Sequence, residues 1–128
     1  RCIRQIRKYY AMPSDKPFEL DFMRQDAIAA NLQRAAEQII DLANHVIRKG
    51  KLGLPKDSRD SFEIPAVAGI IRPELAAKLK AMVGFRNVLV HDYRELDLNI
   101  MKDVIQNRLD DLIGFTNDAL VYIKELNP

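Results

Sequence analysis

Residues 26–46 have the sequence DAIAANLQRAAEQIIDLANHV, in which apolar side chains recur alternately four and three residues apart. This spacing is typical of a helix that buries one face in a helical bundle. The stripe consists of Ile28, Leu32, Ala35, Ile39, Leu42 and Val46. Further alanines beside the stripe, such as Ala36 and Ala43, allow neighbouring helices to approach closely. We therefore expect a long helix over about residues 19–49, with Gly50 as its C-terminal cap.

The sequence on either side predicts three further long helices and one short helix. The first covers residues 1–10, and we expect it to begin upstream of the first residue; it ends near Pro13, because proline disfavours helical backbone in the residue before it. Ser58 can cap the short helix, and Pro73 suits the first position of the next long helix. Asp97 can cap the last helix. Since no alternating apolar pattern indicates a strand, we predict an all-α, up-and-down bundle.

Composition limits the class of protein. A chain of 128 residues with 48% hydrophobic side chains can bury one core, so we expect a single domain over residues 1–128. Its apolar runs fall short of the roughly 20 residues that cross a membrane, and no signal peptide is recognisable. The single cysteine, Cys2, cannot form an internal disulfide, which fits a cytoplasmic location. The net charge of only +2 means that a nucleic acid would be bound by a local cluster of cations.

Residues 86–93, RNVLVHDY, bring an arginine, an amide, an imidazole and a phenol into an otherwise apolar segment. Arginine binds phosphate oxygens through a planar fork and keeps its charge, and histidine takes and returns a proton near neutral pH. On a helix, Arg86 and Tyr93 lie about 20° apart. Asn87 and His91 lie about 100–140° round from Arg86. One helix does not bring Arg86 and His91 together, so we expect a second surface to complete the site.

Other chemistry is poorly supported by the sequence. The motif residues also suit a structural role, in which Arg86 pairs with a carboxylate such as Glu95 and Tyr93 packs its ring. His45 has no acid–base partner nearby in sequence, and we expect it to be structural. We find no Cys/His ligand cluster, no Asp-rich loop and no Gly-rich phosphate loop. Neither a metal nor a cofactor is therefore expected.

The order Arg, four residues, His, one residue, Tyr, with Asn directly after the Arg, resembles the signature of the HEPN superfamily. Its tyrosine-bearing form is similar to the HepT branch of toxin ribonucleases. The similarity extends over about residues 3–126: residues 26–43 resemble the family's long second helix, and residues 69–76 resemble the segment before the motif helix. The resemblance implies the HEPN fold and a metal-independent endoribonuclease that acts as a toxin.

The resemblance also implies roles for the motif residues. The ribose 2′-hydroxyl of the RNA would attack the adjacent phosphate, with His91 as general acid or base and Arg86 stabilising the negative charge. Asn87 would orient a phosphate or the imidazole. The basic residues expected to contact RNA are Arg72, Lys78, Lys80 and Arg94.

Partners follow from the same resemblance. It implies a homodimer in which two motif helices face each other, a tRNA or mRNA substrate, and a minimal nucleotidyltransferase as antitoxin. Tyr93 would accept AMP from that antitoxin and so silence the nuclease. Two alternatives remain: a non-catalytic helical partner subunit of the nucleotidyltransferase, and a helical bundle without any site.

Overall fold

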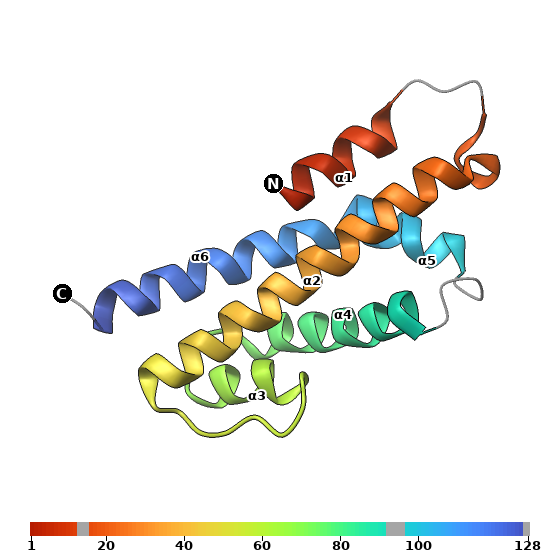
Figure 1. Cartoon of the computed structure of the whole chain (residues 1–128). Coiled ribbons are helices and arrows are strands. Elements are labelled where there is room, and N and C mark those ends of the chain that lie inside the picture. The colour runs from red at the N-terminus through yellow and green to blue at the C-terminus, as the bar shows by residue number, and fades with distance from the viewer. Residues whose placement is uncertain (13–15, 92–96, 127–128) are drawn as a thin grey trace.

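The structure, a computed structural model, describes residues 1–12, 16–91 and 97–126. Within these residues the chain is helical and contains no strand, and successive long helices run in alternating directions (Figure 1). The elements are α1 (Cys2–Ala11), the 3-10 turn η1 (Phe18–Leu20), α2 (Phe22–Gly50), α3 (Asp60–Val67), α4 (Pro73–His91), α5 (Leu98–Asp103), the π-helical segment η3 (Val104–Arg108) and α6 (Leu109–Leu126). The prediction of an all-α bundle with four long helices and one short helix is confirmed, with α5, η3 and α6 together forming the fourth.

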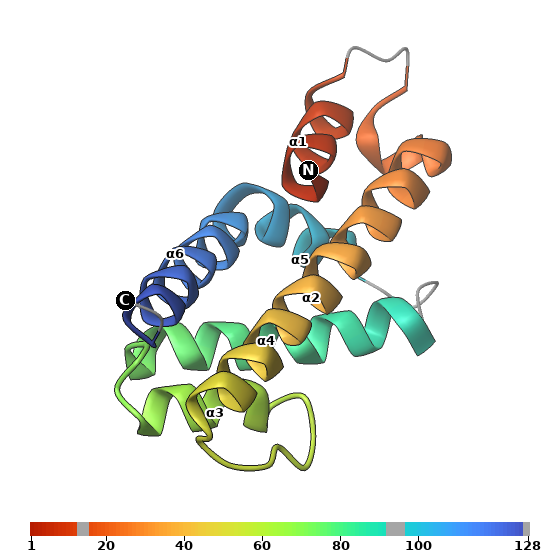
Figure 2. The ribbon, with the colours of Figure 1, turned by 60° about the vertical axis from the view of Figure 1, so that its left-hand side comes forward.

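Helix α2 is the central element of the bundle. It contacts α1, α3, α4 and α6, with α1 along its N-terminal half and α3 beside its C-terminal half (Figure 1 and Figure 2). The predicted stripe is buried except for the half-buried Leu42. Ala36 and Ala43 are also buried. These small side chains therefore serve contacts within the chain and offer little surface to a second copy.

The start of α2 differs slightly from the prediction. The helix begins at Phe22 rather than near residue 19, because Phe18–Leu20 form a separate 3-10 turn. Asp21 then caps α2, with its Oδ1 accepting a hydrogen bond from the backbone N–H of Arg24 at 3.1 Å. The buried Gln25 donates from Nε2 to the carbonyl oxygen of Phe18 at 2.7 Å, which holds the turn against the helix.

The end of α2 corrects the predicted role of Gly50. Lys51, not Gly50, adopts the left-handed conformation, with φ 52° and ψ 47°, and closes the helix through its backbone N–H. Gly50 is the last helical residue. A β-carbon at that position would collide with the hydroxyl oxygen of Tyr122 on α6. Glycine therefore makes room here for the Tyr122 side chain and does not serve a left-handed turn.

Ser58 does not cap helix α3 as predicted, because the N-cap position is Arg59, which makes no side-chain cap hydrogen bond. Asp57 accepts the backbone N–H of Asp60 through Oδ1 at 2.9 Å. The fully buried Ser61 donates from Oγ to Oδ1 of Asn44 at 2.6 Å and so joins α3 to α2. Ser58 is left free for another contact, described below.

The last helix is continuous in direction but not uniform. It passes from α5 through the π-helical turns Val104–Arg108 into α6. A π-helical turn rotates the residues after it relative to those before it. Leu109 follows the buried Ile105 by four residues and lies in the core with an exposed fraction of 1%. Phe115 is also buried and packs edge-on against Phe62 of α3.

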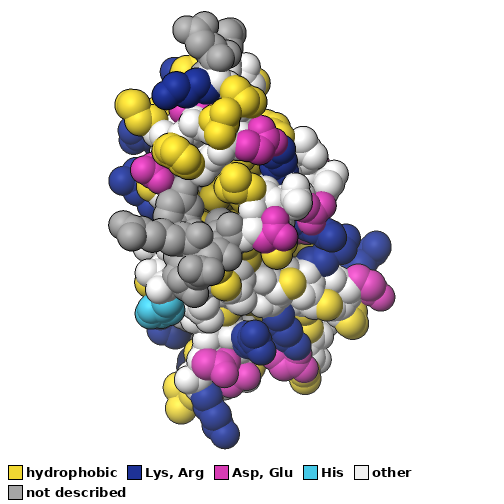
Figure 3. Space-filling model, turned by 90° about the vertical axis from the view of Figure 1, so that its right-hand side faces the viewer, with side chains coloured by type: hydrophobic (Ala, Val, Ile, Leu, Met, Phe, Trp, Pro, Cys, Tyr) yellow, Lys and Arg dark blue, Asp and Glu magenta, His cyan; other side chains and the backbone are white. Residues whose placement is uncertain are grey.

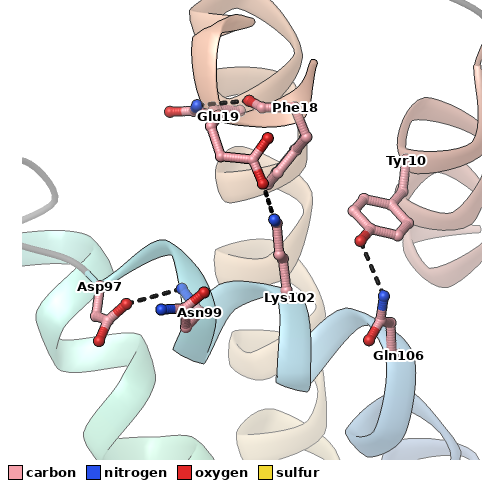
Figure 4. A network of polar contacts seen from close by, with 8 residues as sticks. Tyr10, Phe18, Glu19, Asp97, Asn99, Lys102 and Gln106 are labelled. Carbon is pink, nitrogen blue, oxygen red and sulfur yellow. Dashed lines mark hydrogen bonds and ion pairs between the residues drawn. The ribbon is translucent and has the colours of Figure 1, made fainter.

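Polar contacts join the start of this helix to the N-terminal part of the chain (Figure 4). Asp97 caps α5 as predicted, accepting the backbone N–H of Asn99 through Oδ1 at 2.8 Å. Lys102 forms an ion pair with Glu19 of η1. One turn later, Nε2 of Gln106 donates to the hydroxyl oxygen of Tyr10 at 2.9 Å. The chain is thus fixed in position directly after residues 92–96, which follow the motif helix.

The close approach at Gly50 generates the first prediction. We expect Gly50→Ala to lower the free energy of unfolding by about 1–3 kcal/mol, because the Tyr122 side chain must move away from the added methyl group. The matched control is Gly114→Ala, where a β-carbon meets no atom within 4 Å outside its own helix. That variant should raise stability by about 0.5–1 kcal/mol. Urea denaturation followed by circular dichroism measures both; an equal shift in the two variants would contradict the assigned role of Gly50.

Candidate functional site

The motif residues that the structure describes all lie on the last two turns of α4, which ends at His91. Phe85 and Leu89 are buried and point to the core. These two apolar side chains fix the rotation of the helix, so that the polar motif residues face outwards or lie at the boundary of the core. Tyr93 and Arg94 lie outside the described residues.

Arg86 lies at that boundary and is half-buried. Its Nη2 donates to the Oγ of Ser58 at 3.2 Å. Its Nε is buried and has no hydrogen-bond partner. No carboxylate among residues 1–12, 16–91 and 97–126 forms an ion pair with it, and Glu95 lies outside these ranges. Within the described part of the chain, Arg86 is therefore a fixed cation whose charge is not neutralised, which favours binding of an anion.

Asn87 and His91 are both exposed, on a different side of α4 from Arg86. Four residues separate them, so they lie about 40° apart around the helix. His91 lies about 140° round from Arg86 and about 7.5 Å further along the axis. The structure therefore brings Asn87 and His91 together and keeps Arg86 apart from both. On one chain, Arg86 and the pair Asn87 and His91 therefore face different directions, and the completion of a site by a second surface stays a prediction.

Two residues beside the motif helix were not foreseen from the sequence. Ser58, which contacts Arg86, and its neighbour Arg59 come from the segment between α2 and α3. Arg59 is exposed, and its Nη2 lies 3.8 Å from where a β-carbon of Gly84 would be. A separation of 28 residues between Ser58 and Arg86 leaves no periodicity that could reveal the contact. Only the packing of α3 against α4 brings them together.

The predicted RNA-binding lysines occupy different sides of α4. Lys80 lies seven residues before Asn87 and thus on nearly the same line, about 10 Å away along the axis; it pairs with Glu63 of α3. Lys78 lies half a turn from Asn87 and faces α6, where an aspartate approaches it at 3.9 Å. Arg72 is exposed just before α4 begins. Lys80 alone among these three shares the line of the motif residues.

The surface around the end of α4 carries charges of both signs. Over the described part of this face, basic and acidic side chains are interspersed, and hydrophobic side chains gather in its upper part (Figure 3). Among the described residues, no three His, Cys, Asp or Glu side chains gather so as to hold a metal ion. Within the described ranges, no helix combines the length and the apolar character needed to cross a membrane. An anion would be held here by a few individual cations.

Comparison with known proteins places this geometry in a family. Residues 1–119 match the family described as Ribonuclease HepT-like. The chain is 46% identical over 115 residues to the mRNA nuclease HepT of Shewanella oneidensis, covering 90% of this chain and 85% of that protein. A shorter match, 34% identical over 68 residues, covers 53% of this chain and 46% of the tRNA nuclease HepT of Aphanizomenon flos-aquae.

A solved structure extends the comparison to the fold. The tri-AMPylated HEPN toxin of Shewanella oneidensis, in complex with MNT antitoxin, superposes with a TM-score of 0.87. The two chains are 44% identical, and the match covers 94% of this chain and 90% of that one.

Proposed function

The chain belongs to the HepT-like ribonuclease family, and we propose that it is a metal-independent endoribonuclease that acts as the toxin of a toxin–antitoxin pair. The observation that carries this proposal is that the charge of Arg86 is not balanced by a carboxylate among the described residues. Its guanidinium donates to a neutral hydroxyl, and its buried Nε has no hydrogen-bond partner. The exposed His91 follows five residues later. A phosphate would satisfy the free donors of Arg86, and an exposed imidazole can exchange protons with a bound substrate.

The proposed reaction uses the RNA's own 2′-hydroxyl. The 2′-oxygen attacks the adjacent phosphorus while a histidine imidazole takes its proton. The bond to the 5′-oxygen breaks, the leaving oxygen receives a proton, and a 2′,3′-cyclic phosphate remains. Arg86 stabilises the charge on the phosphate oxygens as the pentacovalent species forms. Asn87, one turn from His91, orients a phosphate oxygen or the imidazole.

The exposed side of α4 supports a homodimer. Beside Asn87 and His91 it carries the exposed Ala77 and Ala81 and the half-buried Gly84. A β-carbon at Gly84 would meet only the Arg59 guanidinium, at 3.8 Å, outside its own helix. Glycine inside a helix costs about 1 kcal/mol relative to alanine, and no packing among the described residues requires it here. A second copy whose α4 lies against this side would use the small residues for close approach and bring Asn87 and His91 of the two subunits near one another.

The relatives also support the nature of the antitoxin. The Shewanella toxin has been solved in AMPylated form with an MNT antitoxin. We propose that the present chain likewise pairs with a minimal nucleotidyltransferase and accepts AMP on Tyr93, two residues after His91. Each AMP adds a phosphodiester with a negative charge, which would pair with Arg86 and occupy the path of the RNA. The two relatives differ in substrate, since one is an mRNA nuclease and the other is a tRNA nuclease.

The next prediction tests the chemistry. Arg86→Ala should reduce the rate of RNA cleavage about 10²–10³-fold, as expected for loss of a charge-stabilising donor. His91→Ala should reduce it about 10²–10⁴-fold. The control, His45→Ala on α2, should retain the rate per folded molecule, and EDTA should leave it unchanged. Retention of cleavage by both motif variants would contradict the roles of Arg86 and His91, whereas absence of cleavage by the wild type would favour the alternative role of a non-catalytic partner subunit.

The dimer yields a separate prediction. Sedimentation should give twice the 14.7 kDa mass of one chain. Inactive Arg86→Ala and His91→Ala chains, mixed after mild unfolding and refolding, should recover about a quarter of the wild-type cleavage, because half of the dimers contain one intact pair formed across the twofold axis. If the mixture stays inactive while the wild type is dimeric, each site is built from one chain.

The modification of Tyr93 can be tested directly. Incubation with the cognate nucleotidyltransferase, ATP and magnesium should raise the mass of the protein in AMP-sized steps and silence cleavage. Tyr93→Phe should abolish both changes because it lacks the accepting hydroxyl, whereas the control Tyr9→Phe should not. If the Tyr93→Phe variant is still modified and silenced, the acceptor is another residue.

A further inference from the structure

The segment between α2 and α3 presents two side chains to the motif helix from a rigid backbone. Oδ2 of Asp60 accepts the backbone N–H of Lys56 at 2.9 Å, and Oδ1 of Asp57 accepts that of Asp60 at the same distance. The carbonyl oxygen of Arg59 accepts two backbone N–H groups of the first turn of α3. Hydrogen bonds thus hold the backbone before and after Ser58 and Arg59, which keeps both residues beside α4.

Arg59 lies on the side of α4 that carries Asn87 and His91. Its guanidinium is adjacent to Gly84, which lies seven residues before His91 and therefore about 20° from it around the helix. The distance along the axis is about 10 Å, too great for Arg59 and His91 of one chain to contact the same phosphate group. The guanidinium is exposed and forms no ion pair with the carboxylates in the described parts of the chain.

Lys80, the neighbouring basic residue on this side of α4, differs from Arg59 in its pairing. It already forms an ion pair with Glu63, so its charge is largely balanced within the protein. Arg59 keeps an unpaired, planar fork of donors, which suits bidentate contact with phosphate oxygens. An RNA strand that passes along the line of Asn87 and His91 would meet Arg59 after leaving the scissile phosphate.

We propose that Arg59 binds a phosphate of the single-stranded RNA next to the one that is cleaved, and so aligns the strand along α4. This inference rests on the proposed ribonuclease function and adds a substrate-binding residue to it. Ser58 and Arg59 then act together: Ser58 holds Arg86 in place, and Arg59 contacts the flanking phosphate. Arg59 takes no part in proton transfer or in stabilising the reacting phosphate.

The test measures binding separately from cleavage. The probe is a fluorescein-labelled, single-stranded 2′-O-methyl RNA of mixed sequence, which lacks the attacking hydroxyl and cannot be cut. Its anisotropy is titrated with the full-length protein at several salt concentrations. The variants are Arg59→Gln, which removes the charge, Arg59→Lys, which keeps it, and Arg4→Gln. Arg4 is an exposed arginine on α1, at the other end of α2 from α3.

Loss of one phosphate contact has a characteristic signature. Arg59→Gln should raise Kd about tenfold at low salt and reduce the slope of log Kd against log salt by about 0.7. Arg59→Lys should restore the slope but only part of the affinity, and Arg4→Gln should match the wild type. With cleavable RNA, Arg59→Gln should raise KM and leave kcat within about twofold, in contrast to a loss of kcat in Arg86→Ala.

Failure of this inference is distinguishable from failure of the proposed function. If the wild type cleaves RNA and binds the probe, but Arg59→Gln equals Arg4→Gln in Kd and salt slope, Arg59 does not bind RNA while the ribonuclease proposal stands. A fall in kcat without a rise in KM would likewise overturn the flanking-phosphate role. If the wild type neither binds nor cleaves, both proposals are wrong.

Discussion

Burial of α2 between the other helices is the constraint on which the rest of the molecule depends. Ile28, Ala43 and Val46 have no exposed surface, although they lie on one helix more than four turns long. Each large apolar side chain buried in this way contributes about 1.5–3 kcal/mol, and the alanines between them let the helix axes come close. Because α3 and α4 both pack on α2, their mutual position is set by that core. The motif residues on α4 are therefore placed by the packing of the core.

The same packing explains why Arg86 and the pair Asn87 and His91 face different directions on one chain. Phe85 and Leu89 must face the core, and this requirement leaves one rotation for α4. Asn87 and His91 then face outwards and Arg86 lies at the boundary, about 140° away from His91. An α-helix cannot twist to bring them together without losing its core contacts. The proposed chemistry needs a charge and a proton donor at one phosphate, and in the proposed dimer a second α4 would supply the group that one helix cannot.

Periodicity and capping residues are sufficient to predict the helices, the Asp97 cap and the placement of the motif near the end of α4. Contacts between distant segments cannot be predicted in this way. The sequence around Gly50 predicts a left-handed cap, whereas the actual role of this glycine depends on Tyr122, which comes much later in the chain. The bond between Ser58 and Arg86 and the position of Arg59 arise from the docking of α3 on α4. The π-helical segment could not be predicted either, because its residues also occur in ordinary α-helices and only its packing in the bundle distinguishes it from one.

The sparse distribution of charge links the proposed activity to its proposed control. Basic and acidic side chains are mixed on the face where α4 ends (Figure 3), so the proposed binding of RNA there would depend on a few cations rather than on a broad positive field. A broad field would be little affected by one added negative charge. A half-buried guanidinium without a carboxylate partner in the described part of the chain is affected strongly, because screening by salt is weak where water is partly excluded. A single phosphodiester placed beside Arg86 would therefore remove most of the attraction for substrate, and this is the kind of group that AMPylation of Tyr93 would add.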